Sequence, residues 1–158
     1  MAQMLETNSL LSLWAKKKAS PAGEVRYPLL FHMLDVAMVT QELWEKSLQP
    51  GARRFFAKQL SLSEAEACSW ISFWAGLHDI GKASPVFQRK SEVAKYQLES
   101  MGFVFESHVT DVPHDIITAH VFPNLVKNTL PKHNFPGDMA QSVGVFPTHV
   151  GVNRVVKE

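Results

Sequence analysis

Apolar residues recur at helical spacing in three separate stretches of this sequence, and this recurrence limits the fold more than any other feature. In the first stretch, which follows Pro28, the residues His32, Val36, Val39 and Leu43 lie at offsets of 4, 7 and 11. These offsets trace one face of a helix with 3.6 residues per turn, and proline is common in the first turn of a helix. The pattern predicts a helix that turns His32 toward the interior.

The second stretch begins with Ser63 and Glu66, which have the spacing of a capping box at a helix N-terminus. The apolar face that follows consists of Trp70, Phe73, Trp74 and Leu77. It leads into His78 and Asp79, and Gly81 is suited to end the helix. We therefore expect the His-Asp pair at the C-terminal end of this helix and the aromatic side chains in the core.

The third stretch follows Pro113, and in it His114, Ile117, Val121 and Leu125 share one helical face. Between residues 84 and 112 the periodicity is weak and no strand pattern is sustained, so loops or short helices are expected there. The predicted fold class is all-α: a helical bundle whose three main helices each direct a histidine to the same interior.

Composition limits the kind of protein. The chain has 158 residues, of which 46% are apolar and 20% charged, so one globular domain is the expectation. No apolar run approaches the ~20 residues that a bilayer needs, and no basic segment followed by an apolar block opens the chain. A single cysteine, Cys68, excludes an internal disulfide framework. These features favour a cytoplasmic location without membrane insertion, and a net charge of +1 provides no global attraction to nucleic acid.

The candidate ligands are His32, His78, Asp79 and His114. Imidazoles and a carboxylate suit Mn, Fe, Co, Ni or Zn, and water bound to such a metal becomes a nucleophile near neutral pH. A single histidine on an apolar face is more often a hydrogen-bonded core residue than a ligand, so each one alone has a structural explanation. Three inward histidines beside an aspartate favour the metal site. Three further histidines have no such placement, and we interpret them as surface or loop residues: His108, His120 and His133.

Three ordered blocks carry a resemblance to a known family: LWAKKKAS, YPLLFHMLDVAMV and WAGLHDIGKASPVFQ. Together they resemble the N-terminal HD nuclease domain of the CRISPR-associated helicase-nuclease of type I interference systems. The resemblance covers roughly residues 11 to 144 and implies an HD-domain helical bundle. In that family the first histidine, the HD pair and a later histidine that opens a helix bind metal. The resemblance therefore implies His32, His78, Asp79 and His114 as ligands.

The same resemblance assigns further roles. Asp79 is implied as a catalytic as well as a ligating residue, and Lys82 corresponds to a family lysine that is expected to meet a substrate phosphate. Asp35, three residues after His32, has two interpretations that remain open. Its carboxylate either orients the His32 imidazole without binding the metal itself, or only caps or solvates the helix.

The implied activity is metal-dependent hydrolysis of phosphodiesters in single-stranded DNA, as part of antiviral CRISPR defence. The implied partners are single-stranded DNA, a CRISPR surveillance complex and a separate helicase, since no Gly-rich loop ending in GK[ST] occurs in the chain. Two other functions remain open. One is an inactive HD-fold remnant or interaction module that docks on a CRISPR complex, and the other is an HD phosphohydrolase acting on nucleotides.

The C-terminal residues differ from the family pattern. We divide the chain into an HD-type domain, residues 1–144, and a tail, residues 145–158, where the family would carry a His-His-Gly motif. The tail has only His149, so we expect a truncated domain that fills at most part of a two-metal site, with weak or absent cleavage. We also expect it to expose apolar surface and either to self-associate or to be marginally stable as a monomer. The segment PTHVG can be encoded by codons that form an inverted complement, which suggests a translated CRISPR repeat; an unrelated C-terminal strand is the alternative.

Overall fold

The computed structural model of the chain describes residues 9–106 and 110–129, and the chain divides into two compact units, Met1–Ala119 and His120–Glu158. The elements are β1 (Trp14–Ser20), β2 (Gly23–Pro28), α2 (Leu29–Lys46), α3 (Pro50–Leu60), α4 (Glu64–Gly76), the 3-10 helix η1 (Leu77–Ala83), α5 (Pro85–Gln88), α6 (Glu92–Ser100) and α7 (His114–Thr129). The predictions for His108, His133 and the tail at residues 145–158 lie outside the described residues. His120 is exposed, as expected of a surface histidine.

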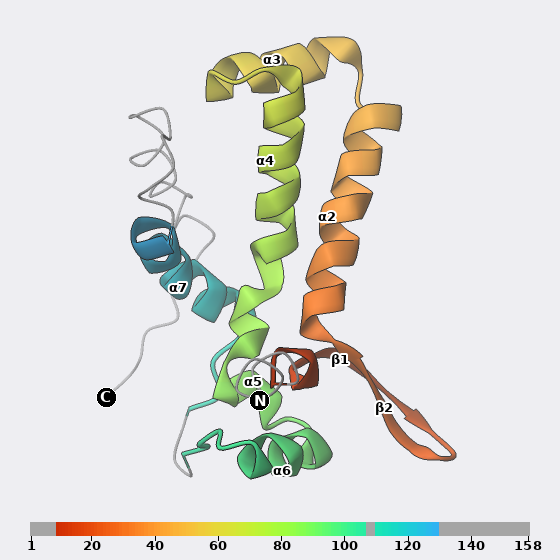
Figure 1. Cartoon of the computed structure of the whole chain (residues 1–158), viewed down its shortest axis with the longest axis vertical. Coiled ribbons are helices and arrows are strands. Elements are labelled where there is room, and N and C mark those ends of the chain that lie inside the picture. Colours follow the sequence, from red (N-terminus) through yellow and green to blue (C-terminus); the bar gives the residue numbers. More distant parts are fainter. Residues whose placement is uncertain (1–8, 107–109, 130–158) are drawn as a thin grey trace, which may run out of the picture. The chain divides into compact units, whose positions relative to one another are not determined.

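Helices α2 and α4 form the centre of the first unit. They lie side by side, and α3 crosses them at the end distant from the hairpin (Figure 1). Gly76 permits their close approach, because a Cβ at this position would lie 3.0 Å from the carbonyl oxygen of Met33 and 3.2 Å from Cβ of Ala37. At the α3 end a small apolar core closes the packing; its buried members are Trp44, Ala57, Ala67 and Cys68.

The predicted capping box of α4 is confirmed. The Ser63 hydroxyl accepts a hydrogen bond from the backbone N–H of Glu66, and the Glu66 carboxylate accepts one from the backbone N–H of Ser63 at 2.8 Å. Helix α2 begins at Leu29, directly after Pro28, as the sequence predicted. Both helix starts therefore followed from local sequence chemistry.

The predicted apolar face of α2 is only partly correct. His32 is buried, but Val39 and Leu43 are 57% and 54% exposed. The face that packs on α4 instead carries Met33 and Ala37, and α4 is the helix that α2 contacts most extensively in the described residues. The aromatic residues of α4 also differ from prediction: Phe73 is 43% exposed and stacks beside Trp70 and Trp74 at the helix surface.

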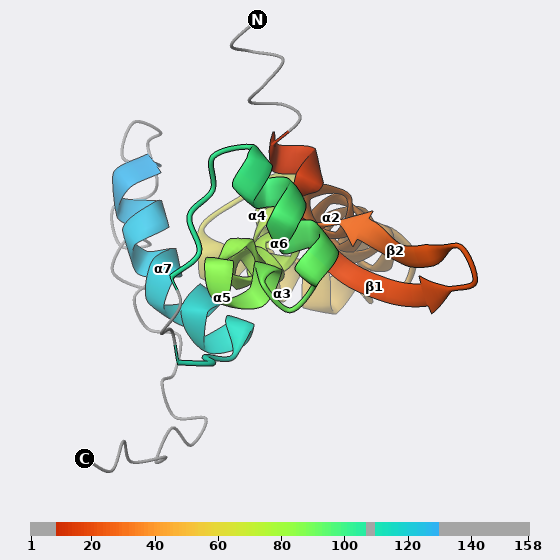
Figure 2. The same cartoon turned by 90° about the horizontal axis from the view of Figure 1, so that it is seen from below.

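The predicted all-α class needs one correction, since β1 and β2 form an antiparallel two-stranded sheet. Gly23, with a φ of 118°, closes the hairpin opposite Ser20 in a left-handed conformation that favours glycine. Seen from below, the hairpin projects away from the helices (Figure 2). Three consecutive lysines in β1 obscured the alternation of a strand, which is why the sequence pattern did not reveal it.

The chain does not end its helix at Gly81. The α-helix stops at Gly76, and a 3-10 helix continues from Leu77 to Ala83. Three residues complete one turn of a 3-10 helix, so side chains three positions apart lie on the same side. This change of helix type aligns Asp79 with Lys82, and α5 and α6 follow in the segment that was expected to hold short helices.

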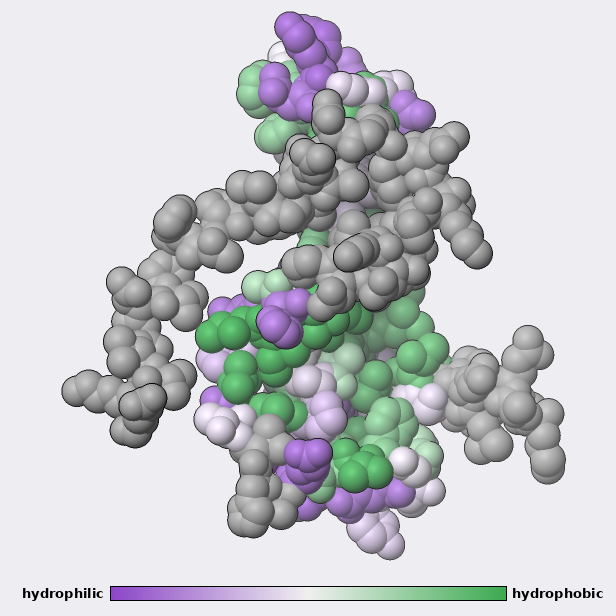
Figure 3. Space-filling view, turned by 90° about the vertical axis from the view of Figure 1, so that its left-hand side faces the viewer, coloured by the Kyte–Doolittle hydropathy of each residue, from purple (hydrophilic) through white to green (hydrophobic). Residues whose placement is uncertain are grey.

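Several large apolar side chains are exposed in the described part of the chain. On α2 they are Leu30, Phe31, Leu34, Met38, Val39 and Leu43. Figure 3 shows hydrophobic side chains gathered across the middle of another face of the molecule. None of the described helices is long and apolar enough to span a membrane.

Candidate metal centre

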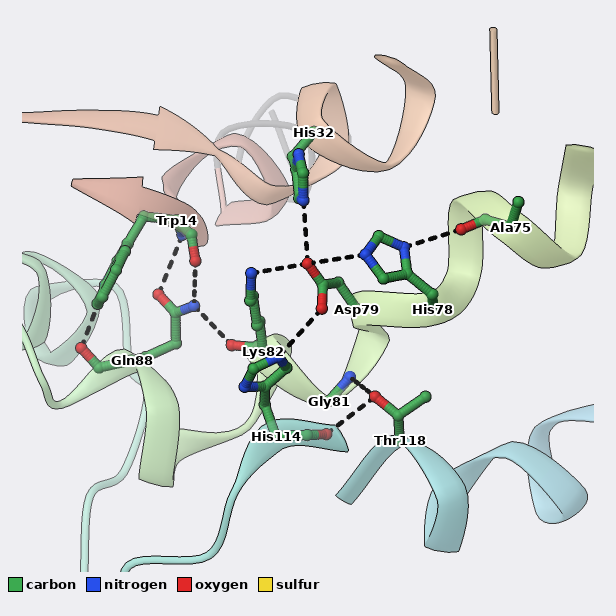
Figure 4. Close-up of polar contacts among 10 residues, drawn as sticks. All are labelled: Trp14, His32, Ala75, His78, Asp79, Gly81, Lys82, Gln88, His114 and Thr118. Atoms are coloured by element: carbon green, nitrogen blue, oxygen red, sulfur yellow. Dashed lines mark hydrogen bonds and ion pairs between the residues drawn. The ribbon is translucent and has the colours of Figure 1, made fainter. Parts of the chain in front are cut away.

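The Asp79 carboxylate is the centre around which the predicted site residues lie. Asp79 is buried in η1, the tight turn that follows α4. Three imidazoles reach it from three different elements: His32 from α2, His78 from η1 and His114 from the start of α7 (Figure 4). His32 and His114, which are 82 positions apart in the chain, thus both contact the Asp79 carboxylate.

Each imidazole approaches the carboxylate through its Nε2 atom. The Nε2 atoms of His32 and His78 lie 2.9 Å and 3.2 Å from Oδ2 of Asp79. The Nε2 atom of His114 lies 3.1 Å from the other oxygen, Oδ1. The ligand atoms of His32, His78 and Asp79 all fall within 4.8 Å of one another, a grouping able to hold a metal ion, whereas His114 stands on the other side of the carboxylate.

The site lies at the surface of the helical unit and not in its interior, which corrects one expectation. The side chain of His32 is buried, but those of His78 and His114 are 47% and 35% exposed. A small molecule or a polynucleotide strand can therefore approach His78 and His114 from solvent.

The backbone determines which nitrogen of His78 carries the proton. Its Nδ1 lies 2.8 Å from the carbonyl oxygen of Ala75, which can only accept a hydrogen bond, so Nδ1 is the donor. In the neutral imidazole Nε2 then presents a lone pair toward Oδ2 of Asp79. Two lone pairs that face each other are unfavourable unless the imidazole is protonated or a cation lies between them. This donor set fits a metal ion.

Lys82 supplies the positive charge beside Asp79. Its ammonium donates a hydrogen bond to Oδ2 at 2.7 Å, and the side chain is 11% exposed. Burial alone raises the pKa of the Asp79 carboxyl, but the hydrogen bond and charge of Lys82, the charge of His78 and the hydrogen bond of His32 outweigh it and lower the pKa below its ordinary value. Asp79 is therefore ionised at neutral pH, the form in which it can bind a cation.

His114 is fixed by a contact that the sequence did not reveal. The Thr118 hydroxyl donates to the carbonyl oxygen of His114 at 2.9 Å and accepts from the backbone N–H of Gly81, also at 2.9 Å. The two backbones approach so closely that a Cβ on Gly81 would lie 2.0 Å from the His114 carbonyl oxygen. Glycine is required here for space, and it was interpreted in the sequence only as a helix terminator.

The open question about Asp35 receives an answer in this geometry. Its carboxylate accepts a hydrogen bond from the Tyr27 hydroxyl at 2.6 Å. Asp35 therefore connects α2 to strand β2, and this contact gives it a structural partner other than His32. Gln88, which no motif or periodicity singled out, donates a hydrogen bond to the backbone carbonyl oxygen of Lys82. Its only sequence signal was its place in the block WAGLHDIGKASPVFQ.

Comparison with known proteins agrees with this arrangement. The family "Cas3, HD domain" matches residues 14–151. The CRISPR-associated endonuclease/helicase Cas3 of Thermus thermophilus is 34% identical over 142 residues, which cover 88% of this chain and 15% of that protein. The protein of the same description from Escherichia coli is 35% identical over 79 residues, covering 49% of this chain and 9% of that protein.

A solved crystal structure of a CRISPR-associated protein has the same fold, with a TM-score of 0.70 and 33% sequence identity over 76% of this chain and 13% of that one. The chain thus spans at most 15% of the length of these relatives. The family match, in contrast, extends over most of the chain and includes the elements that surround Asp79. The chain belongs to the family of Cas3 HD domains, a CRISPR-associated family of HD nucleases.

Proposed function

We propose that this chain is a metal-dependent nuclease domain that hydrolyses phosphodiesters of single-stranded DNA in CRISPR interference. The observation that carries the proposal is the convergence of three Nε2 atoms, from His32, His78 and His114, on the Asp79 carboxylate. Belonging to the family supports the nuclease class, while the metal and the single-stranded substrate are the proposal's own additions.

The proposed ligands are His32, His78, Asp79 and His114. A divalent transition metal, with Mn, Ni, Co, Fe and Zn as candidates, supplies Lewis acidity for phosphate chemistry when bound. The protein's part is to hold the ligands ready: Ala75 keeps the lone pair of His78 on Nε2, and the lowered pKa of Asp79 keeps its carboxylate ionised. The exposure of His78 and His114 leaves the open side to the scissile phosphate.

Lys82 has the proposed role of steadying that phosphate. In the structure its ammonium is bound to Asp79, only 2.7 Å from Oδ2. A lysine ammonium is a compact charge on a flexible stem, so a small rotation moves it from a carboxylate to a neighbouring phosphate oxygen. We propose that Lys82 neutralises Asp79 in the free protein and turns to the phosphate when the cation takes over that task.

The proposed partners follow from the reaction. They are single-stranded DNA, a CRISPR surveillance complex and a helicase, with a second copy of the chain as a further candidate because α2 exposes Leu34, Met38 and Val39. The division of the chain at residue 144 and the CRISPR-repeat origin of residues 145–158 remain proposals of the sequence alone. DNA sequence at the locus tests the latter: codons for Pro147–Gly151 without an inverted complement would contradict it.

Cleavage of circular single-stranded DNA tests the function. Purified protein is incubated with Mn²⁺, Ni²⁺ or Co²⁺, beside the variants Asp79→Ala and Asp111→Ala. Asp111 is a matched control, because its carboxylate is exposed and pairs only with Lys90 in the described residues. We expect weak, metal-dependent cleavage that disappears in Asp79→Ala, persists in Asp111→Ala and needs no ATP.

The competing functions give different results in the same experiment. Release of phosphate from mononucleotides, with the DNA left intact, would identify a nucleotide phosphohydrolase. Intact DNA and intact nucleotides together with substoichiometric metal would identify a non-catalytic module that retains the fold. Cleavage that is equal in Asp79→Ala and in the unmodified chain would contradict the proposed site itself.

A further inference from the structure

The side-chain amide of Gln88 is one of the most buried polar groups in the described part of the chain, at 1% exposure. Gln88 is the last residue of α5, the short helix that follows η1. A buried amide without hydrogen-bond partners is costly, and a glutamine is retained in such a position only where its donors and acceptor are used. The partners of Gln88 therefore indicate what it does.

Its amide joins two segments that are distant in the sequence. Nε2 donates to the carbonyl oxygen of Lys82 at 2.7 Å and to the carbonyl oxygen of Trp14 at 2.9 Å, while Oε1 accepts from the backbone N–H of Trp14 at 3.1 Å (Figure 4). Both N–H groups and the carbonyl are thus used, and the amide has a single workable orientation. Gln88 connects the first residue of strand β1 to the end of η1.

The bond to Lys82 acts on the candidate metal centre through the backbone. The last carbonyl groups of a helix have no partner inside it, and a 3-10 helix holds its turns less firmly than an α-helix. Helix α4 supports η1 at Leu77, and Gln88 supplies the missing donor at Lys82. Asp79 lies between these two supports, and so its carboxylate is held at a fixed position relative to His32 and His114.

The hairpin is attached to the same segment by other contacts as well. The Lys17 ammonium donates to the carbonyl oxygen of Lys90 at 2.6 Å, and the Ser91 hydroxyl donates to the Glu24 carboxylate. The indole N–H of Trp14 also donates to the backbone carbonyl of Gln88 at 3.3 Å, a contact that does not involve the Gln88 side chain. Removing the amide therefore takes away the support of η1 and two hydrogen bonds to the Trp14 backbone, while the Lys17, Ser91 and indole contacts still attach the hairpin.

We propose that Gln88 is a positioning residue: through Lys82 it holds η1 in the conformation that presents His78, Asp79 and Lys82 to the candidate metal centre. The statement about η1 stands on the hydrogen bonds alone, whereas its consequence for metal binding rests on the proposed function. Gln88 touches neither metal nor substrate in this role. A buried glutamine that merely packs would lower the stability of the fold without any specific effect on η1.

The test compares Gln88→Met with Leu98→Ala. Methionine keeps the length and removes every hydrogen bond of the amide, while Leu98 is a fully buried apolar residue of α6, outside η1. Amide hydrogen exchange in metal-free protein is the first measurement. We expect exchange at Leu77–Ala83 to rise about tenfold more than exchange in α4 for Gln88→Met, and the two to rise together for Leu98→Ala.

Titration with Mn²⁺ and the visible spectrum of bound Co²⁺ are the second measurement. Gln88→Met is expected to weaken Mn²⁺ binding by about tenfold and to alter the Co²⁺ spectrum, as the loss of a supporting partner does at other metal sites. Leu98→Ala should leave both unchanged well below its melting temperature. Gln88→Leu, which keeps an apolar side chain of similar size and also removes every hydrogen bond of the amide, is expected to follow Gln88→Met.

The results separate the two proposals. If exchange in η1 changes no more in Gln88→Met or Gln88→Leu than in Leu98→Ala, the positioning role is wrong, whatever the metal does. If the unmodified chain binds no Mn²⁺ or Co²⁺ at all, the proposed function fails, while the exchange measurement still decides the role of Gln88. A Gln88→Leu variant that matches the unmodified chain in exchange would also overturn the inference, because the donors would then be unnecessary.

Discussion

The two ends of the α2–α4 pair are held together by different interactions. At the end crossed by α3, the buried residues are apolar or weakly polar, and they pack on partly buried leucines and an isoleucine. At the end next to the hairpin, the buried residues include apolar ones such as Trp14 and Leu29 and four polar ones that take part in hydrogen bonds, namely Asp79, Lys82, Gln88 and Ser91. One end is a small apolar core, and the other adds a polar network to its apolar packing.

The difference reflects what each end has to do. Apolar contacts are non-directional and tolerate small shifts, so they stabilise a fold without fixing individual atoms. Hydrogen bonds fix directions, and a carboxylate that faces three imidazoles and an ammonium needs fixed directions. Substitutions in the α3-end core should therefore change stability, and substitutions in the polar network should change the site.

The largest expected effect is that of Trp44→Ala in the α3-end core. Trp44 is buried and meets Phe56 with their ring centroids 6.2 Å apart, so its truncation leaves a cavity. We expect a loss of about 3 to 5 kcal/mol in the free energy of unfolding, with the Mn²⁺ affinity of the remaining folded protein unchanged. Denaturant unfolding and titration calorimetry measure the two quantities. Phe55→Ala, which truncates a 58% exposed ring, should be close to neutral.

Gly81→Ala should act on both stability and the site. Its Cβ would lie 2.0 Å from the His114 carbonyl oxygen and 2.7 Å from the Thr118 backbone nitrogen, so η1 and α7 have to separate. The expected loss of stability is about 3 kcal/mol, with weaker metal binding because His114 is displaced. Gly51→Ala is the matched control: nothing lies within 4 Å of its Cβ, and alanine in this helix should be neutral or slightly stabilising. Unchanged metal affinity in Gly81→Ala would argue against His114 as a ligand.

The third prediction concerns acid. Burial raises the pKa of Asp79. The opposing effect of Lys82, His78 and His32 is larger, so the pKa lies below its ordinary value of 3.8. A carboxyl with a depressed pKa adds stability above its unfolded pKa and loses it as the pH falls through the folded pKa. The metal-free chain should therefore lose stability below about pH 4, and Asp79→Asn should lose less over the same range. Urea unfolding at successive pH values measures this, and equal slopes in both proteins would contradict it.

Other carboxyl groups give Asp79→Asn a remaining pH dependence of stability, and one of them lies at the α4 N-terminus. The Ser63 hydroxyl and backbone N–H hold the pKa of Glu66 below its usual range as well. Glu66 is fully exposed, so its share should be the smaller one. The comparison between the polar network and the rest of the unit thus extends to their dependence on pH.

Some features of the fold could be predicted from the sequence and others could not. The α4 capping box and the start of α2 follow from local rules, and the inward placement of His32 follows from helical period. The hairpin did not follow, because Lys16, Lys17 and Lys18 hide its alternation. Nor did the exposure of Val39, which depends on how many neighbours α2 has.

The supports of the site were the least predictable part. Gly81 and Thr118 meet 37 residues apart, and Gln88 meets Trp14 across 74 residues. Such pairs have no periodicity, since each is determined by the meeting of two elements in space. A pattern along the chain can indicate which residues bear the chemistry, but the partners that orient them are visible only once the fold is known.

The smallest predicted effect is that of Ser63→Ala, and it extends the comparison to a directional bond outside the polar network. Alanine removes the acceptor for the Glu66 N–H, and such a loss costs about 1 kcal/mol of stability. The control is Ser69→Ala: the Ser69 hydroxyl donates only to the Ala65 carbonyl within α4, so its loss should be neutral or slightly stabilising. Metal affinity should be unchanged in both variants, because Ser63 lies at the opposite end of α4 from η1. Weaker Mn²⁺ binding in Ser63→Ala alone would show that loss of the N-cap disturbs η1 at the other end of α4. The distinction between an end that stabilises the fold and an end that positions the site would then be wrong.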